Sequence, residues 1–364
     1  MAANLQLTMR WYGIDDRVSL RDISQIPSMK GVVTALHQLP AGEVWDVSRL
    51  KSLKKTIESA GLSFSVIESI PVHEDIKTGK GDRDKYIEAY KQSLKNVGAV
   101  GIPVVVYNFM PIFDWMRTDL AMSLPDGSTC LNYIDAVLES IDLSEGTGDL
   151  PGWSSAYSAE QLAKLRKDYE GVDEEQLWKN LEYFLKAIVP VAEASGVKLA
   201  IHPDDPPWSI FGLPRIIVDE KSMRRVCDIV KSPANGITLC TGSLGANPDI
   251  DLAGMARRLK DKIHFVHGRN VRTTGYRSFF ETSHDDEKGN VSLPAVIQTL
   301  YDVGYSGPIR PDHGRMIWGE EGRPGYGLYD RALGASFIWG IWRGCKENRS
   351  IKKKSFIDAL KFWR

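Results

Sequence analysis

The feature that most constrains the fold of this chain is an alternation of short apolar segments with amphipathic stretches. Most of the apolar segments are followed by a stretch with helical periodicity, such as Val47–Ala60 or Glu174–Ser195. This alternation is typical of a parallel sheet covered by helices. The apolar segments are Thr8–Gly13, Gly31–Leu36, Ser63–Ile70, Ile102–Phe109, Val197–His202, Gly236–Cys240, Lys262–His267 and Gly307–Asp312. Eight such units in one chain predict an α/β fold of the (β/α)8, or TIM-barrel, type.

The main alternative is an open, doubly wound sheet that binds a dinucleotide. Such a sheet needs a GxGxxG turn after its first strand. No such turn follows the first segment here, and the sequence TGSLG at Thr241–Gly245 does not have that pattern. The length would allow two domains, but no internal boundary is visible. We therefore expect a single catalytic domain over residues 1–364.

One connection departs from the regular alternation. About 65 residues, from 110 to 174, separate the fourth predicted strand from the fifth, whereas such connections are usually about 4–6 residues long. The segment is rich in Asp, Gly, Ser and Trp. We expect it to form a cap over the barrel mouth or an oligomer contact.

Charge and cysteine usage narrow the class of protein. A formal net charge of −1 provides neither the basic surface of a nucleic-acid-binding protein nor an attraction to acidic membranes. Apolar runs such as Ile102–Tyr107 are too short to cross a bilayer, and the first residues do not look like a secretion signal. The four cysteines show no CxxC pair. We expect reduced thiols, a cytoplasmic location and no nucleic-acid or membrane partner.

Four residues that can bind metals stand at the ends of four predicted strands: His202, Cys240, His267 and Asp312. If these strands are neighbours in a barrel, their C-terminal ends meet at the mouth, where barrel enzymes place their chemistry. Two imidazoles, a thiolate and a carboxylate suit a borderline transition metal better than magnesium or calcium. Each residue alone has a simpler explanation, as a packed histidine, a small buried cysteine or a turn residue. The combination predicts a metal site.

Two further histidines, His264 and His313, lie close in sequence to these four residues. His264 and His267 lie three positions apart on one strand, so they point to opposite faces, and we expect His264 to pack between strand and helix. His313 can reach the mouth together with Asp312 only if the chain turns at Pro311. His313 would then be a proton-transfer group; the alternative is a solvated loop histidine.

Charged residues near other strand ends suggest an anionic substrate. Arg10, Arg269, Arg272 and Arg315 could together clamp a carboxylate with two parallel hydrogen bonds, although a lone surface arginine is normally just solvated. After His202 the prolines of HPDDPP stiffen the loop, which would hold the imidazole and the carboxylates of Asp204 and Asp205 in place.

These residues resemble the mannonate dehydratase family along essentially the whole chain. The matching stretches are MRWYG (Met9–Gly13), GVVTALHQLPAGEVW (Gly31–Trp45), VIESIPVHEDIK (Val66–Lys77), YNFMPIFDW (Tyr107–Trp115), HPDDPP (His202–Pro207), RPDHG (Arg310–Gly314) and PGYGLYDRALG (Pro324–Gly334). The family converts D-mannonate to 2-dehydro-3-deoxy-D-gluconate and water in hexuronate (glucuronate) breakdown. The resemblance thus implies a hydro-lyase acting on a sugar acid.

The resemblance also implies site residues and a cofactor. The family has a xylose-isomerase-like barrel with Mn²⁺ or Fe²⁺, and its ligand pattern falls here on His202, Cys240, His267 and Asp312. Its acid/base histidine and tyrosine fall on His313 and Tyr326, and its substrate arginine on Arg10. Four protein ligands leave two positions on a six-coordinate ion, whereas a tetrahedral zinc site would be closed. A homo-oligomer, a dimer or larger, is expected from its frequency among enzymes.

Three other functions stay open at this point. A sugar isomerase on the same barrel would use two hard cations and several carboxylates, and the cysteine argues against that set. An endonuclease-type metal barrel would need a basic groove. A non-catalytic sugar-acid-binding protein would hold a structural metal closed to solvent and would show no turnover.

Overall fold

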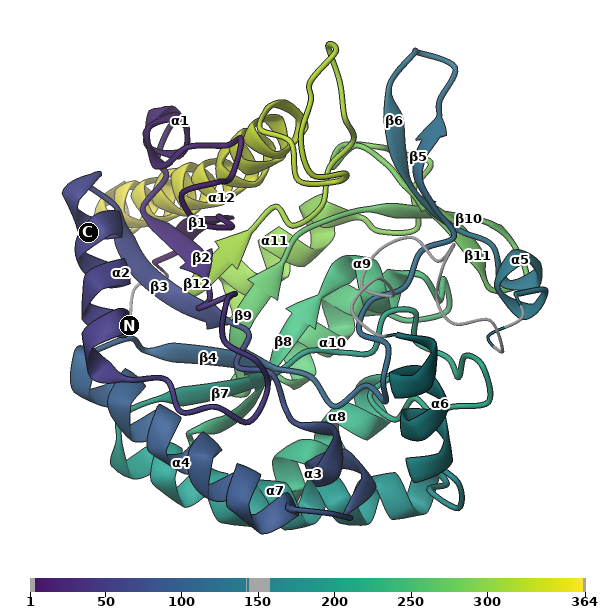
Figure 1. Ribbon diagram of the computed structural model, residues 1–364. Coiled ribbons are helices and arrows are strands. Elements are labelled where there is room, and N and C mark those ends of the chain that lie inside the picture. Colours follow the sequence, from purple (N-terminus) through teal and green to yellow (C-terminus); the bar gives the residue numbers. More distant parts are fainter. Residues whose placement is uncertain (1–3, 142, 144–157, 363–364) are drawn as a thin grey trace.

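Eight parallel strands close into a barrel (Figure 1). The computed structural model describes residues 4–141, 143 and 158–362. The barrel strands are β1 (Gln6–Arg10), β2 (Gly31–Thr34), β3 (Ser63–Glu68), β4 (Val104–Tyr107), β7 (Lys198–Ile201), β8 (Asn235–Cys240), β9 (Ile263–His267) and β12 (Pro308–Arg310). Their order around the barrel is β1-β12-β9-β8-β7-β4-β3-β2. Each overlaps one of the eight predicted segments, and six lie wholly within them, whereas β1 and β8 begin two residues and one residue earlier. The closed barrel confirms the TIM-barrel prediction.

Helices cover the outside of the barrel (Figure 1). They are α1 (Leu20–Gln25), α2 (Val47–Ser59), α3 (Glu74–Thr78), α4 (Arg83–Val100), α7 (Glu174–Ala194), α8 (Glu220–Ile229), α9 (Thr241–Gly245), α10 (Leu252–Arg258), α11 (Leu293–Asp302) and α12 (Tyr329–Phe362). Local sequence sets several boundaries. Asp46 caps α2 by accepting from the backbone N–H of Arg49 at 2.9 Å, and Asp173 caps α7 by accepting from that of Gln176 at 2.8 Å, which satisfies N–H groups without helical partners. Gly101, with φ +74°, ends α4 in the left-handed conformation that glycine adopts most easily.

The barrel interior is a small apolar layer of its own. Its six buried residues are separate from the larger core between strands and helices, and they are Val33, Val66, Val104, Val106, Ala200 and Phe265. Side chains alternate between the two faces of a strand. Residues two positions further along therefore also face inward, which applies to Glu68, His202 and His267. The interior layer thus packs directly beneath these polar side chains, which lie nearer the C-terminal ends of the strands.

A second sheet lies outside the barrel and joins two distant parts of the chain. It is antiparallel, in the order β10-β11-β6-β5. Strands β5 (Asp119–Ser123) and β6 (Thr129–Tyr133) belong to the long connection after β4, whereas β10 (Val271–Gly275) and β11 (Ser278–Glu281) follow β9. The pairing of β11 with β6 joins the two parts. The sequence analysis did not anticipate β10 and β11.

The rest of the connection between 110 and 174 includes α5 (Asp135–Glu139) and α6 (Ala159–Asp168). Residues 142 and 144–157 of it lie outside the described residues. That residues 1–364 form one domain, with 110–174 as a cap or an oligomer contact, stays a prediction.

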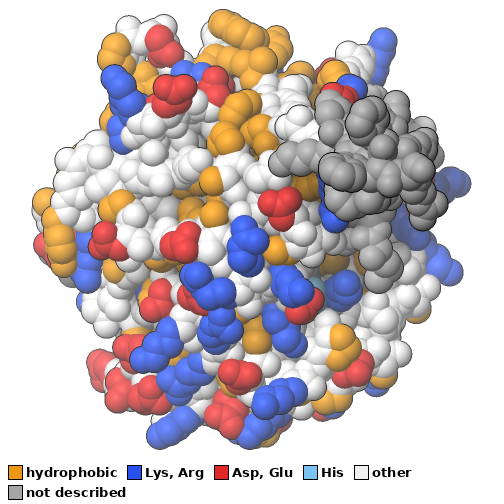
Figure 2. Space-filling view, turned by 180° about the vertical axis from the view of Figure 1, so that it is seen from behind, with side chains coloured by type: hydrophobic (Ala, Val, Ile, Leu, Met, Phe, Trp, Pro, Cys, Tyr) orange, Lys and Arg blue, Asp and Glu red, His pale blue; other side chains and the backbone are white. Residues whose placement is uncertain are grey.

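The surface carries a mixture of side chains. On the face shown in Figure 2, basic and acidic side chains are interspersed over the lower half, and apolar side chains gather towards the upper edge. In the part of the chain that the structure describes, no helix combines the length and apolar character that crossing a membrane requires.

We predict that Phe265→Ala destabilises the barrel strongly. Phe265 is fully buried in the interior layer, and replacing a buried phenylalanine by alanine typically costs about 3–5 kcal/mol because it leaves a cavity. Chemical denaturation should show that loss. Leu333→Ala is the control, because Leu333 is 49% exposed, and its effect should stay within about 0.5 kcal/mol. Equal stability of the two variants would contradict a packed interior layer.

Candidate metal and acid/base site

Three of the four predicted metal ligands lie together at the ends of neighbouring strands. Cys240 on β8 is in register with His267 on β9, and residues in register on parallel strands point to the same side. His202 follows β7 directly. One donor atom from each of the three lies within 4.8 Å of the others, and Nε2 of His202 is 3.2 Å from Nδ1 of His267. The barrel therefore brings these side chains from three separate strands to one place.

The fourth predicted ligand, Asp312, reaches the same place through a turn of the backbone. Asp312 has φ +60°, a left-handed conformation that aspartate tolerates better than most residues. Its Oδ2 lies 3.5 Å from Nδ1 of His267 and 3.8 Å from Sγ of Cys240. The turn also lets His313 face the mouth beside Asp312.

The donor set fits a borderline transition-metal ion. Metal bonds from these groups are about 2.0–2.3 Å long, so donors that share one ion lie roughly 3.5 Å apart, close to the distances above. Burial opposes ionisation of the Cys240 thiol, but Arg269 and the His202 ring outweigh it and lower the pKa of Cys240 well below its usual value. A thiolate is the form of cysteine that binds metals. The thiolate and the imidazoles favour such an ion over magnesium or calcium.

Glu68, which the sequence analysis did not single out, lies behind the His267 ring. The four predicted ligands, which we call the donor cluster, are His202, Cys240, His267 and Asp312. Oε1 of Glu68 lies 3.1 Å from Nε2 of His267, while Nδ1 of that ring faces His202. Arg310 lies 3.1 Å from the Glu68 carboxylate. Burial opposes ionisation of Glu68, but Arg310 and His267 hold its pKa well below its usual range. A carboxylate behind a histidine ligand orients the ring and raises its basicity. The available signal was that Glu68 is the lone charge in the predicted segment Ser63–Ile70, and the structure ends β3 at this residue.

His313 and Tyr326 form a hydrogen-bonded pair beside the donor cluster. Nε2 of His313 lies 2.7 Å from the Tyr326 hydroxyl and 3.7 Å from Oδ1 of Asp312. The ring of Trp115 lies 5.5 Å from the His313 ring, centroid to centroid. Burial raises the pKa of Tyr326 well above its usual value, so its hydroxyl keeps its proton. The pair therefore combines a proton donor with a nitrogen that can accept.

Two of the predicted arginines lie at the site: Arg10 contacts Glu68, and Arg269 contacts Asp312. Nη1 of Arg10 lies 3.2 Å from Oε2 of Glu68, and its guanidinium carbon is 4.8 Å from the centroid of the Tyr12 ring. Nε of Arg10 is buried and has no hydrogen-bond acceptor among the residues that the structure describes. Arg269 is buried as well, with Nε 2.7 Å from Oδ2 of Asp312. Arg10 therefore offers an unused donor at the site.

The other two predicted substrate residues face different partners. Asp204 accepts from the backbone N–H of Ile217 at 3.0 Å, and burial raises its pKa to about 6. Nη2 of Arg315 lies 3.0 Å from Asp330 and its Nη1 3.0 Å from Asp126. Arg315 thus ties the turn between β5 and β6 to the start of α12. Substrate binding by Asp204 and Arg315 stays a prediction.

A buried network of ion pairs continues from the site into the second sheet. Nη1 of Arg117, in the connection before β5, lies 2.8 Å from Oδ1 of Asp205, and its Nη2 lies 2.7 Å from Oε1 of Glu281, the last residue of β11. Arg269 bonds to the same two carboxylates. Sequence reasoning missed Arg117 and Glu281, because only the folded second sheet brings these two distant segments together.

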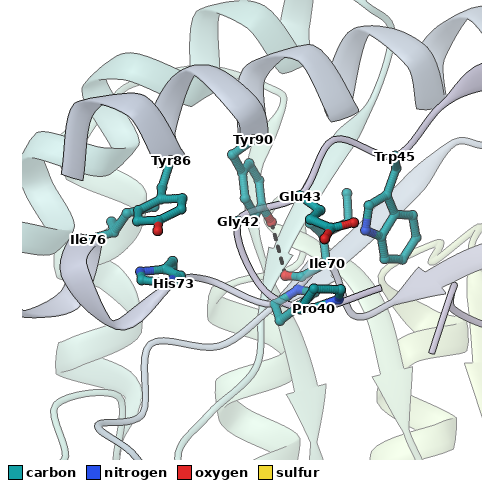
Figure 3. A pocket seen from close by; sticks show the side chains of 10 residues that line it. Pro40, Gly42, Glu43, Trp45, Ile70, His73, Ile76, Tyr86 and Tyr90 are labelled. Atoms are coloured by element: carbon teal, nitrogen blue, oxygen red, sulfur yellow. Dashed lines mark hydrogen bonds between the residues drawn. The ribbon is translucent and has the colours of Figure 1, made fainter. Parts of the chain in front are cut away.

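A separate pocket lies beside the loops that follow β2 and β3, against α3 and α4 (Figure 3). Its lining is largely apolar and aromatic, and none of the predicted site residues contributes to it. His73 stacks on Tyr86 with ring centroids 3.6 Å apart, and its Nδ1 already accepts from the backbone of Asp75. The pocket is thus a packing gap at the side of the barrel and not the centre of the chemistry.

Comparison with known proteins identifies close relatives. The family model described as D-mannonate dehydratase (UxuA) matches residues 5–352. Mannonate dehydratase 2 of Halalkalibacterium halodurans is 52% identical over 340 residues, covering 93% of this chain and 99% of that protein. The mannonate dehydratase of Streptococcus agalactiae serotype V is also 52% identical, with 93% and 98% of the two chains covered.

Solved structures agree with these matches. The crystal structure of mannonate dehydratase from Streptococcus suis serotype 2 has a TM-score of 0.88 and 46% identity, over 96% of this chain and 95% of that chain. A xylose isomerase-like TIM-barrel protein from Mycobacterium smegmatis has a TM-score of 0.53 at 12% identity, which shows the fold alone.

We predict that Cys240→Ser weakens metal retention, because the substitution removes a thiolate from the donor cluster. Metal-depleted protein would be titrated with Mn²⁺ by calorimetry, and bound metal counted by elemental analysis after dialysis. Cys227→Ser is the matched control, since Cys227 is a buried free cysteine on α8, and it should keep the metal. Equal affinity in the two variants would show that Cys240 is not a ligand.

Proposed function

Since the chain belongs to the D-mannonate dehydratase family, we propose that its cluster of two histidines, a cysteine and an aspartate holds the metal ion at which D-mannonate loses water. The dehydration itself is the activity of the family and of this chain, a hydro-lyase. The observation that supports the proposed site most is the position of His313 and Tyr326 within contact of the donor cluster.

The proposed ion is Mn²⁺ or Fe²⁺, held by His202, Cys240, His267 and Asp312. When bound, such an ion supplies Lewis acidity that stabilises negative charge developing on the substrate carboxylate, worth several kcal/mol. Glu68 would keep the His267 ring in the orientation that ligation needs.

The reaction requires two proton-linked steps that His313 and Tyr326 can share. The proton on C2, next to the carboxylate, must leave, and the hydroxyl on C3 must depart with a proton as water. The enol that remains becomes the 2-keto product by ketonisation. In the pair, the Tyr326 hydroxyl keeps its proton and lies within hydrogen-bond distance of Nε2 of His313, a nitrogen that can accept. This arrangement supports His313 as the base at C2 and Tyr326 as the acid at C3.

Arg10 is proposed to bind the substrate carboxylate. It is buried at the mouth end of β1 beside Glu68, and its Nε is an unused donor within the described residues. A guanidinium can hold a carboxylate with two parallel hydrogen bonds, which would fix C2 towards His313. The homo-oligomer and the cytoplasmic location stay predictions from the sequence.

We expect His313→Asn to retain metal and bind D-mannonate but lose about 10²–10⁴-fold in turnover, the scale of one acid/base group. Turnover is followed as 2-keto acid formed, and exchange of the C2 proton as deuterium uptake from solvent. Loss of both product and exchange is the result expected for the base. Exchange without product would instead make His313 the acid. His264→Asn is the control, because Nδ1 of His264 donates to the backbone carbonyl of Leu199 at 2.7 Å and not to a predicted site residue. Near-normal turnover in both variants would remove His313 from the mechanism.

We expect Arg10→Ala to lower turnover of D-mannonate severely while metal content and fold are retained. Arg10→Lys should restore only part of the rate, because an ammonium cannot reproduce the planar, two-pronged contact of a guanidinium. Steady-state kinetics with circular dichroism and metal analysis would test this. Unchanged kinetics in the alanine variant would show that Arg10 only packs against Glu68.

A further inference from the structure

The ring of His313 is held from behind by a carboxylate that belongs to the second sheet. Nδ1 of His313 lies 2.8 Å from Oε1 of Glu281, on the side of the ring opposite to the Tyr326 contact. Glu281 is 1% exposed and His313 4% exposed, so water does not compete for this bond. One ring nitrogen therefore faces a carboxylate and the other faces the tyrosine hydroxyl.

The neighbours of Nδ1 determine which tautomer this geometry favours. Nη1 of Arg269 is also near, at 3.3 Å, but a guanidinium can only donate, and this nitrogen already bonds to Glu281. The carboxylate can only accept, and its contact with Nδ1 is the shorter one. Nδ1 therefore carries the proton and donates to Glu281, which leaves the lone pair of Nε2 towards Tyr326 and the mouth.

Glu281 itself is fixed in position and charge. Besides His313, its Oε1 accepts from Arg117 at 2.7 Å and from Arg269. Burial opposes its ionisation, but Arg269, His313 and Arg117 outweigh burial and lower the pKa of Glu281 to about 2. An ionised carboxylate at Nδ1 stabilises the positive ring that forms when Nε2 takes up a proton.

We propose that Glu281 is a positioning residue for the dehydration: it holds His313 in the Nδ1–H tautomer, with Nε2 aimed at the substrate, and stabilises the ring once it has accepted the C2 proton. The inference rests on the proposed role of His313. The role proposed for Glu281 gives the second sheet a part in the reaction. Strand β11 carries Glu281, and the connection 110–174 supplies Arg117, which holds Glu281 in place.

The test is a double-mutant cycle between Glu281 and His313, measured as turnover of D-mannonate by the metal-loaded enzyme. Glu281→Gln keeps the shape and removes the charge. We expect it to lower kcat about 10–100-fold, the usual effect of losing a group that orients a functional histidine, with little change in KM. In a His313→Asn background the same substitution should lower kcat no further, because a residue that acts through His313 has nothing left to act on.

Two further variants separate orientation from stability. Glu281→Asp keeps the charge facing the arginines but withdraws the carboxylate by about 1.5 Å, one carbon–carbon bond, so it should fold and still lose turnover. Asp205→Asn is the matched control, because Asp205 pairs with the same two arginines and makes no hydrogen bond to His313 among the described residues. Its effect on kcat should be the same with and without His313.

The outcomes distinguish the inference from the function on which it rests. If His313→Asn turns over normally, the role of His313 fails and the inference about Glu281 fails with it. If His313→Asn is impaired but both Glu281 variants turn over normally, only the inference about Glu281 fails. If Glu281→Gln lowers kcat equally in both backgrounds, as Asp205→Asn should, Glu281 has a structural role alone and the inference is overturned.

Discussion

The register of the parallel strands is the constraint on which the rest of the structure depends. Because Cys240, His267 and Arg310 are in register on β8, β9 and β12, their side chains all point into the barrel. The apolar layer below them, which includes Phe265, separates these side chains from the N-terminal end of the barrel. A shift of any of these strands by one residue would turn its functional side chain outward.

Placing so many charges inside a barrel is stable only if they are paired. The buried ion pairs join four guanidinium groups to four carboxylates: Arg10, Arg117, Arg269 and Arg310 with Glu68, Asp205, Glu281 and Asp312. Removing one member would leave its partner charged and buried, which typically costs about 3–5 kcal/mol. These eight charges cancel one another within the network.

The sequence predicted the parts of the molecule that follow from local pattern. Strand-sized apolar segments and amphipathic helices indicated the barrel, and the strand-end rule selected His202, Cys240 and His267, which do lie together. The same rule did not select Glu68, because the predicted segment ran on to Ile70 whereas β3 ends at Glu68. It could not select Glu281, because nothing local distinguishes a glutamate at the end of an unpredicted strand. The role of Arg117 could not be predicted for the same reason. It lies in a connection whose fold depends on pairing with residues more than a hundred positions away.

That pairing has a consequence for how the site is assembled. In the second sheet Phe279 of β11 is in register with Tyr133 of β6, and Glu281 lies two residues beyond Phe279, on the same face of β11. Arg117 lies two residues before β5, and β5 pairs with the edge of β6 that does not face β11. The sheet therefore sets the distance between Arg117 and Glu281, and their ion pair in turn sets the position of the carboxylate behind His313. The orientation of that histidine consequently depends on a sheet that is not part of the barrel. Sequence change on β5 or β6 can alter it without touching a residue at the mouth.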